Sequence, residues 1–220
     1  MITLNKEPHF RRFLGQRVLP VVALIAAVGL AGAVNTITAA ESQPVSNRAT
    51  PLPAGKQTTL GLYVTSREAY EKWKAAAETV TIVDVRTPEE YMFIGHATMA
   101  WNIPVASQSH QWNAEKKQFP MSPLADFVAR VKKVAGESDT LMVMCRSGGR
   151  SAIAVNMLAK AGFKNVYNIT DGFEGDTVKD PNSVFDGQRL VNGWRNSGLP
   201  WTYQLDPDLM VLPGPVKAPK

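Results

Sequence analysis

A single cysteine is the residue around which this sequence most readily builds chemistry. Cys145 is the only cysteine of the 220-residue chain, and it lies between the apolar run 141–144 and a short turn that contains glycine. Residues 152–160 after the turn predict a helix. A strand, turn and helix in this order place the sulfur at the carboxyl end of a buried strand, beside backbone N–H groups and the positive end of a helix. These surroundings favour a reactive thiolate.

A buried cysteine without a chemical role is the simpler alternative, because free cysteines often serve as small core residues. The turn after Cys145 favours chemistry instead. Its two glycines permit positive φ angles, which let several N–H groups point at one anion, and its two arginines add permanent positive charges. We therefore expect the turn to hold an anionic group carried by the sulfur, such as a persulfide. Its members are Arg146, Ser147, Gly148, Gly149 and Arg150.

Charged residues near a second apolar run are weaker candidates for catalysis. Asp84 and Arg86 lie at the end of the β-branched run 80–86, and Glu90 follows in a helix that Pro88 begins. Charged groups beside a buried strand need partners. An ion-pair network that ties this loop to its neighbours therefore explains them better than a catalytic role, although active sites of α/β proteins do gather at the ends of parallel strands.

Metal or cofactor chemistry is not expected from the sequence. The chain has three histidines, which form no metal-ligand pattern with its cysteine, and it contains no CxxC motif and no P-loop. His96 could assist Cys145 as a base. Because no third group that would orient its ring is evident, a hydrogen bond to the backbone is the simpler interpretation of His96.

Strands that alternate with helices predict an α/β fold with a parallel sheet. Thr65 and Glu68 form a capping box, which predicts the start of a helix, whereas residues 107–119 predict an inserted loop. The expected strands are 62–64, 80–86, 141–144 and 162–169, and the expected helices are 66–77, 124–134, 152–160 and a last short one over 191–196.

Residues 1–40 have the three-part layout of a secretory signal peptide. Basic residues precede an uncharged apolar run over 18–34, and small residues follow it. At 17 residues this run is at the short limit for crossing a bilayer, so an uncleaved anchor is the alternative. We favour cleavage, because the glycines and alanines of the run make it weakly hydrophobic. Either way, we expect the rest of the chain to lie outside the cytoplasm, for instance in a periplasm.

Composition adds two exclusions. The formal net charge is +5, but residues 1–40 contribute +3 of it, so the charge of the remainder gives no reason to expect a nucleic-acid partner. One cysteine cannot form an internal disulfide.

Proline-rich residues 41–59 predict a flexible linker, residues 60–203 the folded domain, and residues 204–220 a loose tail.

Taken together, four segments resemble a single-domain rhodanese: 82–91 (IVDVRTPEEY), 95–96 (GH), 102–104 (NIP) and 145–151 (CRSGGRS). The resemblance implies a central parallel sheet with helices on both faces. It also implies a sulfurtransferase in which Cys145 carries a persulfide, taking sulfur from a small donor such as thiosulfate and passing it to a thiol or cyanide. A redox protein would be a suitable partner for such a domain.

Two other classes of function stay open. A related phosphatase would have five residues between its cysteine and arginine, whereas four separate Cys145 from Arg150, which makes a smaller ring of N–H groups. A non-catalytic module would bind a partner or sense oxidants through Cys145. The sequence also departs from the family's last motif, because residues 171–175 and 193–194 are separated by an insertion.

Overall fold

The computed structural model describes residues 51–214. The expected signal peptide and most of the expected linker therefore lie outside the described part, as do the last residues of the chain. No helix within residues 51–214 is long and apolar enough to span a bilayer.

A five-stranded, all-parallel sheet forms the centre of the fold. Strand order across the sheet is β1 (Tyr63–Val64), β8 (Val166–Ile169), β7 (Thr140–Met144), β2 (Val80–Asp84) and β4 (Trp101–Asn102). The neighbouring strands β7 and β2, here called the central strands, consist mainly of apolar and β-branched residues, as expected for strands buried on both faces. They end together, because Asp84 lies beside Met144 in the register, and this edge of the sheet carries Cys145.

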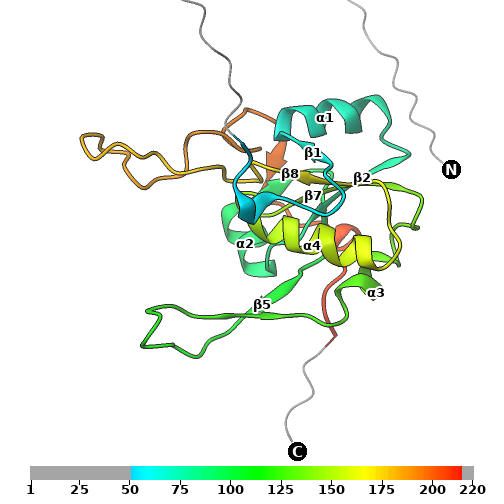
Figure 1. Ribbon diagram of the computed structural model, residues 1–220, viewed down its shortest axis with the longest axis horizontal. Coiled ribbons are helices and arrows are strands. Elements are labelled where there is room, and N and C mark those ends of the chain that lie inside the picture. Colours follow the sequence, from blue (N-terminus) through cyan, green and yellow to red (C-terminus); the bar gives the residue numbers. More distant parts are fainter. Residues whose placement is uncertain (1–50, 215–220) are drawn as a thin grey trace, which may run out of the picture. The chain divides into compact units, whose positions relative to one another are not determined.

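Helices cover both faces of the sheet, as the resemblance implied, and Figure 1 shows α1 on one side of the strands with α3 and α4 on the other. Alternate strand residues face opposite sides. Leu141 and Val143 pack with α3 (Phe127–Val131) and α4 (Gly149–Lys160) in one buried cluster. Met142 and Met144 pack with α1 (Ser66–Ala75) in the other cluster.

Two capping boxes fix the starts of the helices that follow β1 and β2. The Thr65 side chain accepts from the Glu68 N–H and Glu68 reaches back to the Thr65 N–H, which confirms the predicted start of α1. Thr87 and Glu90 repeat this arrangement at α2 (Pro88–Ile94), with proline at its first position.

The predicted short helix over 191–196 is wrong, since these residues form turns. The Trp194 side chain is nevertheless fully buried, and the backbone N–H of Trp194 donates to the Gly172 carbonyl oxygen (2.9 Å). The Gly193 N–H donates to a carboxylate oxygen of Asp171 (3.1 Å). The two halves of the motif that the insertion divides in sequence are therefore joined in space, and the chain then forms β9 (Trp201–Thr202), antiparallel to β3 (His96–Ala97).

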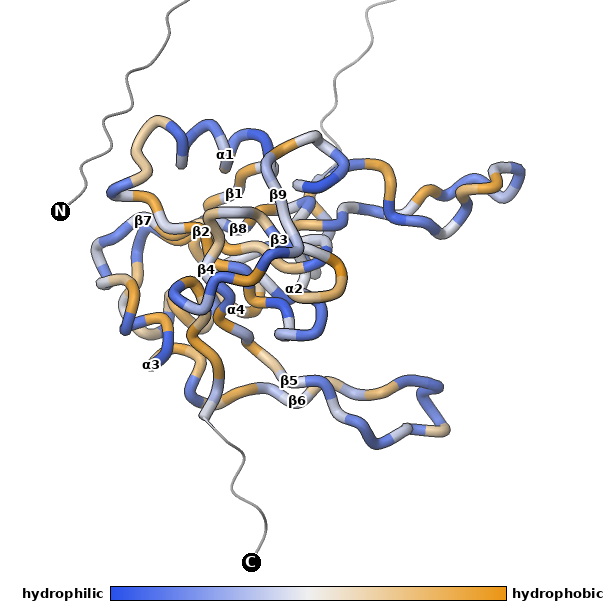
Figure 2. Tube along the Cα trace, turned by 180° about the vertical axis from the view of Figure 1, so that it is seen from behind, coloured by the Kyte–Doolittle hydropathy of each residue, from blue (hydrophilic) through white to orange (hydrophobic). Residues whose placement is uncertain are grey.

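Two hairpin-like segments project from the domain. Arm 1, residues 106–123, consists of β5 (Ala106–Gln108), β6 (Met121–Pro123) and the loop between them, and arm 2 is the insertion 176–192. Both project in the same direction in Figure 1, and Figure 2 shows hydrophobic stretches along otherwise hydrophilic arms. The helix predicted over 124–134 is shorter, since α3 is limited to Phe127–Val131. The Leu124 N–H donates to the Val105 carbonyl oxygen (3.0 Å), which continues the pairing of arm 1 past β6, and residues 132–134 form a turn.

Ordered contacts extend beyond both expected ends of the domain. A 3₁₀ helix, η1 (Ala54–Lys56), precedes residue 60, and the Thr59 N–H donates to the Asn156 side chain on α4 (2.8 Å). At the other end, past the 3₁₀ helix η2 (Pro207–Leu209), the Val211 N–H donates to the Asn102 carbonyl oxygen (2.9 Å). Both segments therefore form hydrogen bonds with residues far away in sequence, although the sequence predicted a flexible linker up to residue 59 and a loose tail from residue 204.

Candidate active site

Cys145 directly follows β7 and lies where β7 turns into α4. Its thiol sulfur accepts the Gly148 N–H (3.2 Å) and lies 3.5 Å from the Ser151 hydroxyl oxygen. The residue is only 2% exposed. One backbone donor, the Gly148 N–H, and the start of a twelve-residue helix therefore face the sulfur, and both favour negative charge. The sequence analysis expected several N–H groups at this point; among residues 51–214 one N–H reaches the sulfur, and the thiol is almost fully buried.

The turn depends on a glycine at position 148. Gly148 has φ +95° and caps α4 in the left-handed region, where residues with a Cβ are strained. A Cβ there would also overlap the Thr170 carbonyl oxygen. Gly149 differs, because it is the first residue of α4 and a Cβ there meets nothing closer than 3.8 Å. Only the first of the two glycines is required by the geometry.

The side chain of Asn168, on β8, is hydrogen-bonded to the turn that follows Cys145. Its amide nitrogen donates to the carbonyl oxygens of Gly148 (3.1 Å) and Lys56 (2.8 Å), and its amide oxygen accepts the Ser151 hydroxyl proton (2.6 Å). Asn168 and Ser151 are both fully buried. Sequence reasoning assigned neither a role; the available signal was a polar amide inside an otherwise apolar strand, which requires partners when buried.

Residues 173–175 clamp the turn from its other side. The Cys145 carbonyl oxygen accepts the Phe173 N–H (2.8 Å), and the Arg146 carbonyl oxygen accepts the N–H groups of Glu174 (2.9 Å) and Gly175 (3.2 Å). The Arg146 side chain itself is exposed. Within residues 51–214 its guanidinium has no carboxylate within 4.0 Å, so its charge is available to a ligand.

Arg150 is placed differently from the expectation that its charge serves the sulfur. Its two terminal nitrogens each lie 2.6 Å from a carboxylate oxygen of Glu90, a bidentate pair between α4 and α2. Burial raises the pKa of Glu90, but the hydrogen bonds and charge of Arg150 lower it more, so the net pKa lies below the usual value. Burial lowers the pKa of Arg150, and Glu90 reverses this shift. The pair mainly fixes the start of α4.

The remaining candidates have structural roles. Arg86 makes a fully buried ion pair with Asp84 (2.6 Å) and donates to the Gly95 carbonyl oxygen (2.8 Å), as the ion-pair interpretation predicted. His96 is buried, stacks on the Tyr91 ring and places Nδ1 3.1 Å from the Tyr91 carbonyl oxygen. Burial lowers the pKa of His96. Within residues 51–214 no group of acidic, histidine and cysteine side chains could hold a metal ion.

Two recesses flank the turn, one beside each arm. Recess 1, about 430 Å³, is lined by Gln108, Gln118, Phe119, Met121, Arg146 and Arg150. Recess 2, about 620 Å³, lies beside arm 2 and the segment before β1, and its polar lining includes Lys56, Ser147, Asp171, Asp176, Lys179 and Arg189. Recess 1 reaches Arg146 and Arg150 of the turn that follows Cys145, and recess 2 reaches Ser147.

Comparison with known proteins gives one consistent family. The rhodanese-like domain matches residues 66–177, from the first residue of α1 to the first residues of arm 2. An uncharacterised protein of Rickettsia conorii is 30% identical over 140 residues, which cover 64% of this chain and 96% of that protein. Thiosulfate sulfurtransferase 16 of Arabidopsis thaliana, a chloroplastic protein, is 40% identical over 91 residues, covering 41% of this chain and 68% of that protein.

A solved structure agrees with this assignment. A crystal structure of a protein from M. tuberculosis superposes with a TM-score of 0.51 at 26% identity, and the match covers 64% of this chain and 96% of that one. The match to the domain includes both central strands, the Cys145 turn and α4. This chain therefore belongs to the rhodanese-like domain family.

Proposed function

We propose that this protein transfers sulfane sulfur through a persulfide on Cys145. Membership of the rhodanese-like family and the similarity to a thiosulfate sulfurtransferase support this class of reaction. The observation that carries the assignment to Cys145 is its environment: the thiol sulfur accepts the Gly148 N–H at 3.2 Å beside the N-terminus of α4. A cysteine that only filled the core would need no such donor.

The reaction has two halves. In the first, the Cys145 thiolate attacks the outer sulfur of thiosulfate, the S–S bond of thiosulfate breaks, and sulfite leaves with the electron pair. In the second, an acceptor such as cyanide or a thiolate attacks the outer sulfur of the persulfide, and Cys145 leaves as a thiolate. No external oxidant or reductant is consumed. The Gly148 N–H stabilises the charge that returns to the Cys145 sulfur.

A phosphatase reaction is less well supported by the same turn. Only four residues separate Cys145 from Arg150, and the Arg150 guanidinium is bound to Glu90 through both terminal nitrogens. It is therefore not free to bind two oxygens of a phosphate. An assay that compares an aryl phosphate with thiosulfate separates the two reactions, and we expect turnover of thiosulfate alone.

Intact mass spectrometry tests the proposal directly. After incubation with thiosulfate and removal of the excess, we expect the native protein to gain the mass of one sulfur atom and to lose it when cyanide is added. Cys145→Ser should fold normally and show no gain. A native protein that gains no sulfur would instead favour a non-catalytic module that binds a partner or senses oxidants.

We also propose, from the sequence of residues 1–40, that the domain works outside the cytoplasm and meets a membrane only if that segment stays uncleaved. The basic residues and the apolar run that follows them support export. N-terminal sequencing of the protein purified from its native host measures this. A mature chain that begins near residue 41 is expected, and retention of residue 1 in a cytoplasmic fraction would contradict export.

A further inference from the structure

We infer that recess 1 binds the organic part of a thiol that carries a carboxylate, so that the sulfur acceptor of this protein is a small anionic thiol. The inference rests on the proposed sulfur transfer and names the substrate class of that same site. Its basis is the junction between arm 1 and the Cys145 turn, where Arg146, Phe119 and Met121 line one cavity.

Charge comes first in the argument. Two guanidinium groups line recess 1, but Glu90 neutralises that of Arg150 through a bidentate pair. Arg146 is exposed and, among residues 51–214, has no carboxylate partner. Arg146 directly follows Cys145 in the chain and lines recess 1, so it brings an unneutralised positive charge from the Cys145 turn into this cavity. A carboxylate or similar anion matches this charge, and a guanidinium can bind both of its oxygens.

The apolar walls suggest a carbon chain rather than an inorganic ion. Phe119 and Met121 come from arm 1, and the Met121 sulfur lies 3.6 Å from a terminal nitrogen of Arg150. Phe119 is held in place although it is 52% exposed: its ring meets that of Trp112 edge-on at 5.2 Å, and its carbonyl oxygen accepts from the Gln108 side chain at 2.9 Å. At about 430 Å³ the cavity lies within the range of small-molecule sites.

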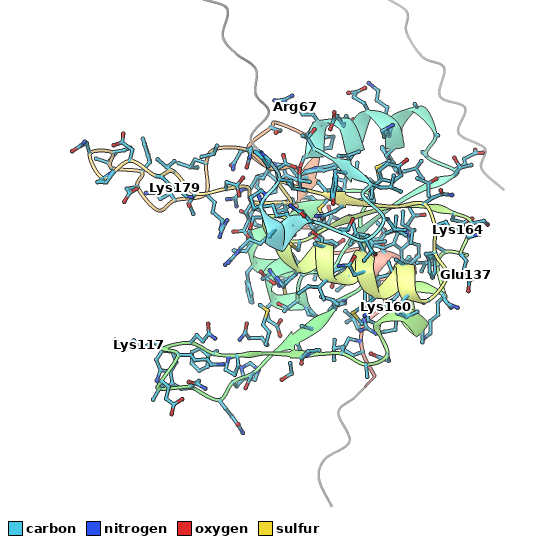
Figure 3. All side chains as sticks on the ribbon, in the orientation of Figure 1. Arg67, Lys117, Glu137, Lys160, Lys164 and Lys179 are labelled. Atoms are coloured by element: carbon cyan, nitrogen blue, oxygen red, sulfur yellow. The ribbon has the colours of Figure 1, made fainter. Side chains whose placement is uncertain are left out.

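Recess 2 is the competing location, but most of its charged groups already have hydrogen-bond or ion-pair partners. Lys56 pairs with Asp176 (2.9 Å), and Arg189 donates to the Gly175 carbonyl oxygen (2.6 Å). Asp171 accepts from two N–H groups and a hydroxyl. Lys179, which Figure 3 places on arm 2, is a further cation of this recess. The polar groups of recess 2 thus serve mainly to close the base of arm 2.

The transfer from recess 1 balances without a further reactant. The thiolate RS⁻ attacks the outer sulfur of the anionic persulfide that the first half-reaction leaves on Cys145, and a bond forms between the two sulfurs. The bond between the outer sulfur and the Cys145 sulfur breaks, Cys145 keeps the electron pair as a thiolate, and the product leaves as the persulfide anion RSS⁻.

Acceptor kinetics test the charge. With thiosulfate as donor, 3-mercaptopropionate and 2-mercaptoethanol are compared as acceptors, since they differ mainly in a carboxylate and a hydroxyl. We expect a KM about tenfold lower for the carboxylate, from one charge-assisted interaction with Arg146. Arg146→Gln should remove this preference, so that the two thiols have equal KM values in the variant. Equal KM values for the two thiols in the native protein would overturn the inference.

A matched pair of aromatic residues tests the walls. Phe119 on arm 1 and Phe185 on arm 2 are equally exposed, at 52% and 51%, but only Phe119 lines recess 1. Phe119→Ala should raise the KM of both thiols several-fold and leave the rate with cyanide unchanged, whereas Phe185→Ala should change neither. Equal effects of the two substitutions, or a thiol KM that responds to Lys179→Ala instead, would contradict recess 1.

Binding of a ligand that cannot accept sulfur separates this inference from the proposed function. S-methyl-3-mercaptopropionate is titrated into the native protein and followed by NMR. We expect amide shifts at Arg146 and Phe119 that disappear in Arg146→Gln, whether or not the protein transfers sulfur. Absence of a persulfide by mass spectrometry would defeat the proposed function, and absence of these shifts would defeat the assignment of recess 1.

Discussion

Two adjacent glycines in the Cys145 turn should respond in opposite ways to the same substitution. Gly148 has φ +95°, and a Cβ there would overlap the backbone carbonyl of Thr170. Gly149 begins α4 and leaves open space. Alanine at either position adds one methyl group, so the comparison isolates backbone geometry from side-chain chemistry.

The expected size follows from two separate costs at Gly148. Holding alanine at a left-handed φ costs about 1–2 kcal/mol, and forcing extra volume against a fixed carbonyl costs about 1–3 kcal/mol. Gly148→Ala should therefore lower the free energy of unfolding by roughly 2–5 kcal/mol, and Tm by about 4–20 °C for a domain of this size. Gly149→Ala should leave it unchanged or raise it by up to about 1 kcal/mol, because alanine favours helix over glycine.

Urea unfolding followed by circular dichroism measures both variants, and stopped-flow persulfide formation from thiosulfate measures the site. Relief of the strain must move the Gly148 N–H away from the Cys145 sulfur, which it reaches at 3.2 Å. Persulfide formation should slow at least tenfold, since losing one preoriented donor costs about 100-fold or more in other enzymes. Substitutions without a structural effect change the free energy of unfolding by about 0.5 kcal/mol or less. If the free energies of unfolding of Gly148→Ala and Gly149→Ala differ by no more than this, the account of the turn is refuted.

Three other perturbations test the framework around the turn. The pKa of Glu90 in the folded protein lies below its usual value of 4.5. Its pair with Arg150 therefore contributes stability that is present above pH 4.5 and is lost as the pH falls through the folded pKa. Glu90→Gln should lower the free energy of unfolding by about 1–3 kcal/mol at pH 7 and by much less at pH 3, which urea unfolding at the two pH values measures. Trp194→Ala should lower the free energy of unfolding by about 3–5 kcal/mol, because it empties a fully buried site, and a shift in Tm of less than about 2 °C would contradict this. Asn168→Asp keeps the shape but loses the amide donors to the carbonyl oxygens of Lys56 and Gly148. Persulfide formation should fall at least tenfold, because the Gly148 carbonyl oxygen in the Cys145 turn is left buried without its donor, which costs about 1–3 kcal/mol. Asn165→Asp on an exposed loop should leave the rate unchanged.

The parts of the fold that were predicted correctly depend on residues that are close together in the sequence. The capping box at Thr65 and Glu68 requires only neighbours three residues apart, and it forms as expected. The strands β2 and β7 were also predictable, because they consist mainly of apolar and β-branched residues. The ends of the elements were predicted less accurately, as in α3, where the Leu124 N–H donates to the Val105 carbonyl oxygen instead of starting the helix.

Long-range pairing explains what sequence reasoning missed at the site. Arg150 was expected to face the sulfur because it belongs to the turn, but its partner Glu90 lies 60 positions earlier in the chain. Asn168 reaches Gly148 across 20 positions and Lys56 across 112. No local pattern encodes these distances. The split motif at residues 171 and 193 shows the same limit, since Asp171 joins its halves through space.

Support for the Cys145 turn and access to it come from different segments of the chain. Asn168 and residues 173–175 hold the turn through backbone carbonyls, and none of them belongs to an arm. Arm 2 leaves after Gly175 and returns before Gly193, two residues whose backbones are in close contact, so its length can change without moving the clamp. Arm 1 likewise meets the turn mainly through side chains of its strands and loop. Substitutions in the arms should therefore alter which molecules react, whereas substitutions at Asn168 or Gly148 should alter whether the sulfur reacts at all.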